Sequence, residues 1–421
     1  MLQFFDYSSK SQKKHNKKDL LVIFGAGIIG RLTLEALRKK NIKVDYFCDS
    51  DVRKHKTEIE NIQIISPNSL NKFGKNIDIF ISTQYFSAIV PFLENRGFKN
   101  LYKSTDLLSD IDIEKIYKPN WSLQLGLGNL PYSTVNRLLK YYDRMGMKED
   151  YIKDGQLNLK TIDIQVTERC SLKCKDCSNL MQYYERPQNS ELNVLFKSIE
   201  KIMACIDNLD EFRVIGGDPF MNKELYKIIN KLVIYEKCKK IVVYTNAKIV
   251  PKNENLECLK NEKILIYITN YGESSSAHSK IIDVLKKENV EFSSFKCTTW
   301  LDCGRIMSNS NKSEKDLEHQ FNNCNTSDLI SLLHGKLYRC PFSANGVNLK
   351  AIPQNDNDEV DLTNESLSIN ELRDQIKKLC YEKKYLTACS FCNGRDYSTA
   401  KIPSATQTRK TLQYEILDHK M

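Results

Sequence analysis

Short apolar runs alternate along the chain with segments in which apolar residues recur every three or four positions. The apolar runs predict buried strands at 20–24, 43–48, 62–65, 77–83, 161–166, 211–215, 241–246, 264–268 and 291–295. The helical spacing predicts helices after Gly30 and over 134–144, 192–206, 225–236 and 277–287. A regular exchange of strand and helix is typical of α/β folds with parallel sheets, which bind ligands at the carboxyl ends of their strands.

The first predicted strand runs directly into a glycine-rich turn, Gly25-Ala26-Gly27-Ile28-Ile29-Gly30. A helix follows, and the second strand ends in Asp49. This order is typical of a nucleotide-binding unit, in which glycines admit a pyrophosphate and the acid binds a ribose hydroxyl. The alternative interpretation is a Rossmann-like domain whose site is empty or vestigial. We expect the domain over 19–105, after a loose tail at 1–18, and it is about half the size of a full dinucleotide fold.

Three closely spaced cysteines follow the strand at 161–166. Cys170, Cys174 and Cys177 have three and then two residues between them. A loop with this spacing brings three thiolates to one soft metal centre, either an iron–sulfur cluster or zinc. A structural zinc site closes with four ligands, whereas three thiolates on a four-iron cluster leave one iron open.

Two further strands of the same region end in small or polar residues. The first is followed by the turn Gly216-Gly217-Asp218-Pro219, and the second ends in Thr245-Asn246. Paired glycines allow close approach of a backbone to a ligand, and a carboxylate there can bind an ammonium group. Because all three features follow strands of one parallel sheet, we expect them at one edge.

These motifs together resemble those of the radical S-adenosylmethionine (SAM) enzymes. The resemblance implies a partial (β/α)6 barrel over 159–305, in which the three cysteines hold a [4Fe–4S] cluster whose open iron binds SAM. It also implies that residues 216–219 and Asn246 bind SAM. Reduction of the cluster would cleave SAM to a 5′-deoxyadenosyl radical that abstracts hydrogen from a substrate carbon, with flavodoxin or ferredoxin as electron donor. The chain departs from the family pattern at Asp218 (usually Glu), Ala247 (usually Gly) and Asp176 (often aromatic).

A second set of cysteines lies in the region 306–421 and consists of Cys324, Cys340, Cys389 and Cys392. A predicted hairpin at Gly335-Lys336 would bring the first two together. Four thiolates can close a zinc site or hold a fully ligated cluster. The spacing resembles the auxiliary-cluster extension called SPASM, or its shorter twitch form, which implies a second [4Fe–4S] cluster. Cys297 and Cys303 are candidate hydrogen-atom donors, with ordinary buried cysteines as the alternative.

Composition narrows the class of protein further. The chain has 421 residues, 28% charged and 41% hydrophobic, and no apolar stretch long enough to span a membrane. No secretory signal is visible, so we expect a cytoplasmic protein whose 14 cysteines serve metal ligation rather than disulfides. The net charge of +10 comes from dispersed lysines, so no nucleic-acid partner is expected. Residues 106–158 are interpreted as a helical connector.

The first domain has the sequence Phe47-Cys48-Asp49-Ser50-Asp51 at the end of its second strand and Asn95-Arg96-Gly97-Phe98 near its own end. In these features it resembles small nucleotide-sugar-binding domains of bacterial surface-sugar pathways. This resemblance implies a small-molecule substrate, a sugar that could be nucleotide-linked, oxidised or epimerised at a hydroxyl-bearing carbon. It makes a complete NAD-dependent dehydrogenase a poor fit. Two alternatives are a radical SAM enzyme that modifies a peptide, and a non-enzymatic iron–sulfur electron carrier or redox sensor. The turn at 216–219 disfavours the carrier, which needs no SAM site.

Overall fold

The computed structural model describes residues 20–83, 86–108, 112–118, 121, 156–307, 311–324, 326–327, 329–395 and 399–416. The chain divides into two compact units, residues 1–148 with 396–398 and residues 149–395 with 399–421. The predicted tail at 1–18, the predicted helix at 134–144 and most of the predicted connector lie outside the described residues. In the part of the chain that is described, no helix is long and apolar enough to cross a membrane.

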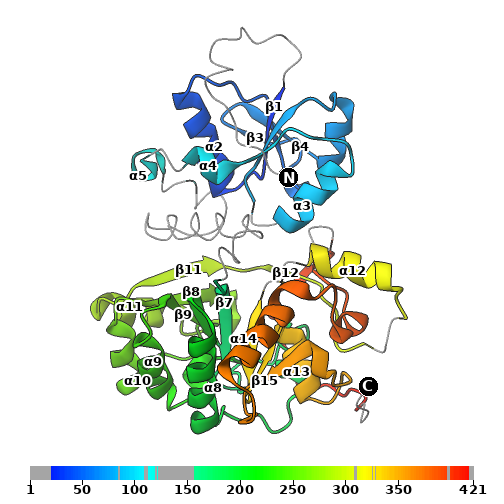
Figure 1. The fold of residues 1–421 in the computed structure, drawn as a ribbon. Helices are drawn as coiled ribbons and strands as arrows, with labels where there is room; N and C mark the ends of the chain where they lie inside the picture. The colour runs from blue at the N-terminus through cyan, green and yellow to red at the C-terminus, as the bar shows by residue number, and fades with distance from the viewer. Residues whose placement is uncertain are drawn as a thin grey trace. The chain divides into compact units, whose positions relative to one another are not determined.

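The first unit is a six-stranded sheet flanked by helices (Figure 1). Its strands lie in the order β3 (Glu58–Ile59), β4 (Ile62–Ile65), β2 (Tyr46–Cys48), β1 (Leu21–Phe24), β5 (Asp78–Ile81) and β6 (Leu101–Lys103). All neighbours are parallel except β3 and β4. The helices are α2 (Ile28–Lys39), α3 (Phe86–Glu94), α4 (Ser104–Leu108) and α5 (Ile113–Ile116). The sequence predicted β1, β2, β4, β5 and the helix α2.

Strand β1 is apolar throughout because both faces of the sheet are covered. Leu21 and Ile23 pack with the α2 side of the core, whereas Val22 and Phe24 pack in a separate cluster on the other face. A parallel strand buried on both faces has this continuous apolar pattern. The strand order reverses at β1, so its carboxyl end is a topological switch point, where open α/β sheets bind ligands.

The second unit is built on one eight-stranded sheet. Its order is β11 (Phe292–Lys296), β10 (Ile264–Asn270), β9 (Cys238–Thr245), β8 (Asn208–Ile215), β7 (Asn158–Gln165), β13 (Ile330–Leu333), β14 (Lys336–Tyr338) and β15 (Glu359–Asp361). The strands from β11 to β13 are parallel, and β13, β14 and β15 form an antiparallel meander. The sheet therefore continues past residue 305, where the sequence placed the end of the barrel, and the sixth parallel strand comes from the predicted auxiliary region.

The helices of the second unit are α8 (Leu192–Cys205), α9 (Leu225–Val233), α10 (Glu254–Glu257), α11 (His278–Lys287), α12 (Glu314–Asn323), α13 (Pro341–Asn348) and α14 (Ile369–Lys377). The predictions for α8, α9 and α11 are confirmed to within three residues at either end. The short strands β12 (Thr299–Leu301) and β16 (Lys401–Pro403) pair with each other in an antiparallel manner.

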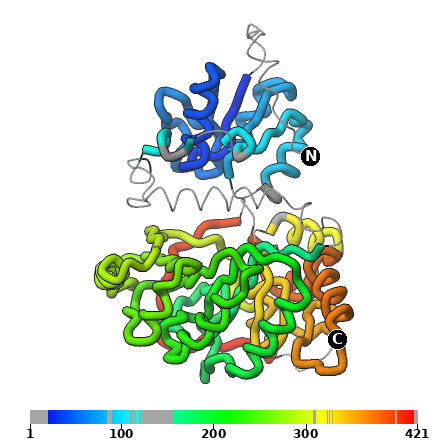
Figure 2. The backbone as a smooth tube through the Cα atoms, turned by 60° about the vertical axis from the view of Figure 1, so that its left-hand side comes forward, coloured from blue at the N-terminus to red at the C-terminus, as the bar shows by residue number. Residues whose placement is uncertain are grey.

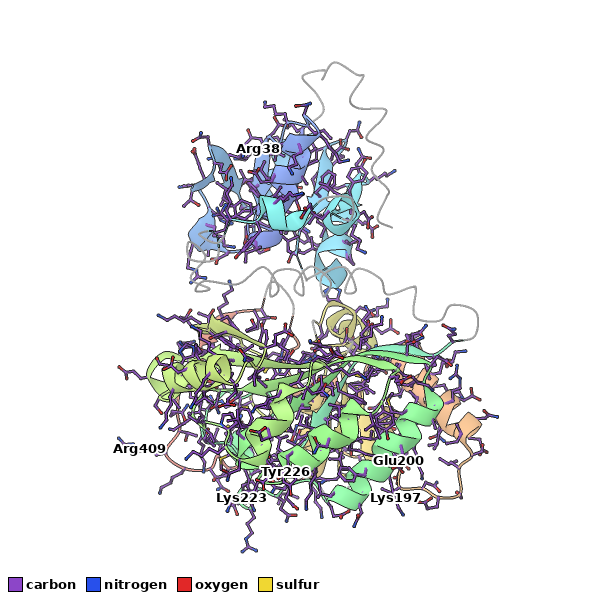
Figure 3. The ribbon with its side chains drawn as sticks, turned by 90° about the vertical axis from the view of Figure 1, so that its left-hand side faces the viewer. Arg38, Lys197, Glu200, Lys223, Tyr226 and Arg409 are labelled. Atoms are coloured by element: carbon purple, nitrogen blue, oxygen red, sulfur yellow. The ribbon has the colours of Figure 1, made fainter. Side chains whose placement is uncertain are left out.

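Helix α8 shows how the apolar pattern fixes one face of this sheet. The Glu191 carboxylate accepts hydrogen bonds from the backbone of Asn193 and Val194, which caps the first turn. The buried residues of α8 form one core with those of α9, α11 and the side chains on one face of the strands. Burial of each large apolar side chain stabilises the fold by about 1.5–3 kcal/mol. Lys197 and Glu200 lie on the opposite, outward face of α8 (Figure 3).

Candidate functional site

The predicted cluster loop follows the carboxyl end of β7. Cys174 is buried, and Cys170 and Cys177 are half-buried. The backbone N–H of Leu172 donates to Cys170 Sγ at 3.4 Å, and the side chain of Gln407 donates to Cys174 Sγ at 3.2 Å. Burial, followed by the nearby Cys177, raises the pKa of Cys174 to about 12. Three grouped, largely desolvated thiols suit a soft metal centre, which would hold them as thiolates.

The two glycines of the 216–219 turn are required by close packing against this loop. A side chain at Gly216 would lie 2.3 Å from the carbonyl oxygen of Thr167, and one at Gly217 would lie 2.2 Å from that of Arg169 and 2.7 Å from Cys170 Cβ. Backbone hydrogen bonds of 2.9 Å run from Gly217 to Thr167 and from Asp218 to Arg169. The sequence predicted that the two glycines allow a ligand to approach the backbone. In the structure they allow the cluster loop to pack against this turn, and this packing sets the position of Cys170.

Asp218 ties the ends of two strands together. Its side chain is fully buried, and its carboxylate accepts hydrogen bonds from the backbone of Phe220 (3.0 Å), the hydroxyl of Thr245 (2.8 Å) and the backbone of Asn246 (3.0 Å). Burial raises the pKa of Asp218 to about 6, although these three donors act in the other direction. The sequence predicted that this acid binds an ammonium group, but its described partners are protein donors. SAM binding by residues 216–219 stays a prediction.

Asn246 connects the end of β9 to the cluster loop. Its amide nitrogen lies 3.6 Å from Cys170 Sγ and 3.1 Å from the hydroxyl of Ser171. The amide oxygen accepts from the backbone of Lys248 at 3.0 Å. The structure therefore brings the three sequence motifs of the second unit to one edge of the sheet, as predicted from their positions after strands.

Sequence reasoning missed the aromatic pair beside this loop. Tyr271 and Trp300 stack edge to face with ring centres 5.5 Å apart, and both pack against the apolar cluster of Leu172, Cys174 and Ala405. Burial raises the pKa of Tyr271, and neighbouring thiols, Cys297 first, add to the effect. Asp176, at the position that is often aromatic in the family, instead lies 3.4 Å from the guanidinium of Arg305.

The four cysteines of the second set line one hollow, together with apolar side chains such as Phe321 and Leu386. Cys324 ends α12, Cys340 precedes α13, and the last two come from the turn at Thr387–Phe391 and its end. The predicted hairpin is confirmed, with Leu333 paired to Lys336 across its turn. Among the described residues, no three ligand side chains of either cysteine set lie close enough as placed to hold a single metal ion. These four cysteines suit an iron–sulfur cluster because they are thiol ligands and line the same hollow.

Cys303 lines the same hollow, so five thiols rather than four meet there. Arg395 is the counter-charge, because burial opposes its positive charge but Cys303 and three other thiols outweigh burial and raise its pKa. Cys177 of the first loop is also influenced by Cys303 and Arg395, although burial is the main cause of its raised pKa. Cys297 lies apart from this hollow, with its thiol 3.5 Å from the carbonyl oxygen of Thr299.

In the first unit, the glycine turn between β1 and α2 is closely packed at two of its three glycines. Gly25 has a φ of +117°, and a side chain at Gly30 would lie 1.9 Å from the carbonyl oxygen of Gly25. A side chain at Gly27 would meet no atom within 4 Å, so the space before α2 is open. Asp49 accepts from the backbone of Ala26 and from Lys54 Nζ, both at 2.8 Å. Its predicted bond to a ribose stays a prediction.

Comparison with known proteins gives two family matches. Residues 164–291 match a family described as a 4Fe-4S single cluster domain, and residues 17–100 match one described as C2185-like, N-terminal. The GTP 3′,8-cyclase of Clostridium acetobutylicum is 26% identical over 140 residues, covering 30% of this chain and 42% of that protein. The enzyme of the same name from Helicobacter pylori is 28% identical over 120 residues, covering 25% and 36%.

The chain thus spans less than half of the length of these relatives. The crystal structure of BtrN with AdoMet and 2-DOIA is 14% identical and covers 61% of this chain and 98% of that one, but its TM-score of 0.34 is too low for an inference. The family match over the cysteine loop and the cyclase relatives support the class of protein that the site defines. That class is the radical SAM enzymes, which the chain resembles over this region, and the matched family is one of single [4Fe–4S] cluster domains.

Proposed function

We propose that the chain acts on a sugar, in a form that could be nucleotide-linked, and oxidises or epimerises one hydroxyl-bearing carbon in surface polysaccharide biosynthesis. The observation that carries the radical chemistry is the cysteine loop, fixed against the glycine turn at 216–217 and bonded to Asn246. When bound, the cluster and SAM supply a carbon-centred radical that removes a hydrogen atom from the substrate. The chain's own task is to hold that C–H bond in position and to exclude water.

One face of the sheet supports a ring-shaped, hydroxylated substrate. Opposite the helix-covered face, the polar-aromatic face crosses neighbouring strands with the side chains Asp163, Arg213, Tyr244, Tyr267 and Phe295. The guanidinium of Arg213 lies 3.3 Å from Asp163 and 4.8 Å from the ring centre of Tyr244. The three aromatic rings follow at 4.9 and 5.1 Å between centres and are half-buried. Aromatic faces pack against the C–H groups of a sugar, while the partly exposed guanidinium of Arg213, held by the buried Asp163, can donate to its hydroxyl groups.

The first unit supports a nucleotide-linked form of the substrate. Its glycine turn leaves open space at Gly27 before a helix N-terminus, and Lys54 and His55 lie beside Asp49. Backbone N–H groups at a helix N-terminus and a nearby lysine favour a diphosphate. The proposal that the sugar is nucleotide-linked rests on this site, whereas the proposed radical chemistry does not depend on it.

The second cysteine set supports an auxiliary cluster. Cys324, Cys340, Cys389 and Cys392 would hold it, with Cys303 and Arg395 beside it. A fully ligated cluster transfers electrons and binds no substrate. It would suit the oxidation of the substrate, in which a second electron leaves the substrate radical towards an external carrier such as flavodoxin or ferredoxin. Zinc at this site would instead favour epimerisation, which needs no net electron removal.

A nucleoside triphosphate is the second candidate substrate, because the curated relatives are GTP 3′,8-cyclases. The test is anaerobic reconstitution with iron and sulfide, followed by incubation with dithionite, SAM and either nucleotide sugars or GTP. Mass spectrometry should detect a sugar product that has lost two hydrogens or, in D2O, has gained one deuterium. Conversion of GTP but of no nucleotide sugar would overturn the sugar assignment. Reconstituted Cys174→Ala protein is the control for products that do not depend on the first cluster.

A further inference from the structure

The chain returns to the first cysteine loop after it has left the second cysteine set. Residues 405–412, here called the C-terminal strap, follow β16 and lie against the loop. Backbone hydrogen bonds run from Lys175 to Thr406 (2.9 Å) and from Thr408 to Lys173 (2.7 Å), and Cys174 and Gln407 form an antiparallel bridge. In Figure 2 the red C-terminal segment runs among the green and yellow elements of the second unit. The strap therefore covers one edge of the loop like an added strand.

Gln407 makes two side-chain contacts with the loop. Its amide oxygen accepts from the backbone of Lys173 at 2.8 Å, and its amide nitrogen donates to Cys174 Sγ at 3.2 Å. The amide nitrogen also donates to the carbonyl oxygen of Ala405, which fixes the rotamer. Cys174 itself is buried beside Leu172 and Ala405. The donor is thus held at one defined side of a desolvated sulfur.

We propose that Gln407 is a positioning residue that sets the reduction potential of the first cluster through Cys174, an inference that rests on the proposed function. Hydrogen bonds to the sulfur ligands of a cluster are among the factors that set its potential. A donor stabilises the reduced cluster more than the oxidised one, because the reduced cluster places more negative charge on sulfur. Gln407 therefore makes the reduction that starts SAM cleavage easier.

The competing explanation is that Gln407 only holds the strap in place. Thr411 separates the two roles, because it holds the strap to the same loop through Lys173, whose Nζ donates a 3.0 Å hydrogen bond to the Thr411 hydroxyl. Gln407→Leu removes the donor to sulfur together with the acceptor for Lys173. Gln407→Glu keeps an acceptor oxygen for Lys173, loses the donor, and adds negative charge beside the sulfur. A purely structural role predicts similar behaviour of Thr411→Val and Gln407→Leu, and a mild effect of Gln407→Glu.

The test is a potentiometric titration of the reconstituted full chain, followed by electron paramagnetic resonance. The first cluster is identified as the signal that changes when SAM is added. Gln407→Leu should lower the equilibrium constant for one-electron reduction by up to about tenfold, which corresponds to 59 mV. Gln407→Glu should lower it further, and Thr411→Val should leave it unchanged.

Two results would overturn the inference while the proposed function stands. One is an unchanged potential in Gln407→Leu and Gln407→Glu, and the other is an equal shift in Thr411→Val. If Gln407→Leu does not take up iron, Gln407→Glu decides, and an unchanged or higher potential in that variant refutes the role. A wild-type chain that takes up no cluster on Cys170, Cys174 and Cys177 would overturn both the inference and the proposed function.

Discussion

Replacing Gly217 by alanine tests how the glycine turn holds the cluster loop. The added Cβ would lie 2.2 Å from the carbonyl oxygen of Arg169 and 2.7 Å from Cys170 Cβ. Carbon atoms in contact settle at about 3.5–4.0 Å, so the loop must move by about 1 Å. Such overpacking costs about 1–3 kcal/mol. The two 2.9 Å backbone hydrogen bonds of this turn would stretch and lose about 0.5–1.5 kcal/mol each.

We therefore expect the free energy of unfolding of the second unit to fall by about 2–6 kcal/mol. The chain has two tryptophans, so a Trp121→Phe background leaves Trp300 as the fluorescent reporter of this unit during urea unfolding. Iron uptake should fall as well, because Cys170 moves with the loop. Gly27→Ala is the matched control, because its Cβ meets no atom within 4 Å. A Gly217→Ala chain that unfolds and takes up iron like the control would refute this account of the turn.

Three further predictions follow from the other contacts. Because burial raises the pKa of Asp218 from 3.8 to about 6, its stabilising effect is full below about pH 4 and is lost as pH rises through 6. The stability of the wild type relative to Asp218→Asn should therefore fall by about 2 kcal/mol from pH 4 to pH 7 in urea titrations, and a constant difference would contradict the assignment. A chain with the first three cysteines replaced should still bind about four irons on the second set, whereas zinc without iron would favour a structural site. Gly27→Val should weaken binding of a nucleoside-diphosphate sugar by at least about tenfold in calorimetry, and an unchanged affinity would remove the phosphate from this turn.

Local patterns were sufficient to predict β1, β2, β4 and β5 of the first sheet and the parallel strands β7 to β11 of the second, but not β3, β6 or β15. The strand β9 and helix α8 combine strong apolar periodicity with clear ends, so their positions follow from neighbouring residues. The motifs after β7, β8 and β9 were also predictable as one edge, because parallel strands end on the same side. The structural role of Asp218 could not be predicted, because its hydrogen-bond partners Thr245 and Asn246 lie at the end of the next strand.

The parts that sequence reasoning missed depend on contacts between distant residues. Gln407 meets Cys174 across 233 positions, and residues 405–412 have no apolar periodicity that would predict an added strand. Cys303 joins the second cysteine set only because residues 303–304 pack beside Asn393, whose backbone bonds to the Cys303 carbonyl oxygen at 2.9 Å. The end of the barrel was placed at 305 because β13 is separated from β11 in sequence, although it pairs directly with β7.

We propose that three thiolates at the end of β7 hold the cluster that cleaves SAM. The most direct measurement is the release of 5′-deoxyadenosine by anaerobically reconstituted chain with dithionite and SAM, quantified by liquid chromatography and mass spectrometry. The wild type should release it, and Cys170→Ala, Cys174→Ala and Cys177→Ala should not, whereas the matched variant Cys258→Ala, away from both cysteine sets, should behave like the wild type. Release of 5′-deoxyadenosine by the Cys174→Ala chain at the wild-type rate would contradict the claim.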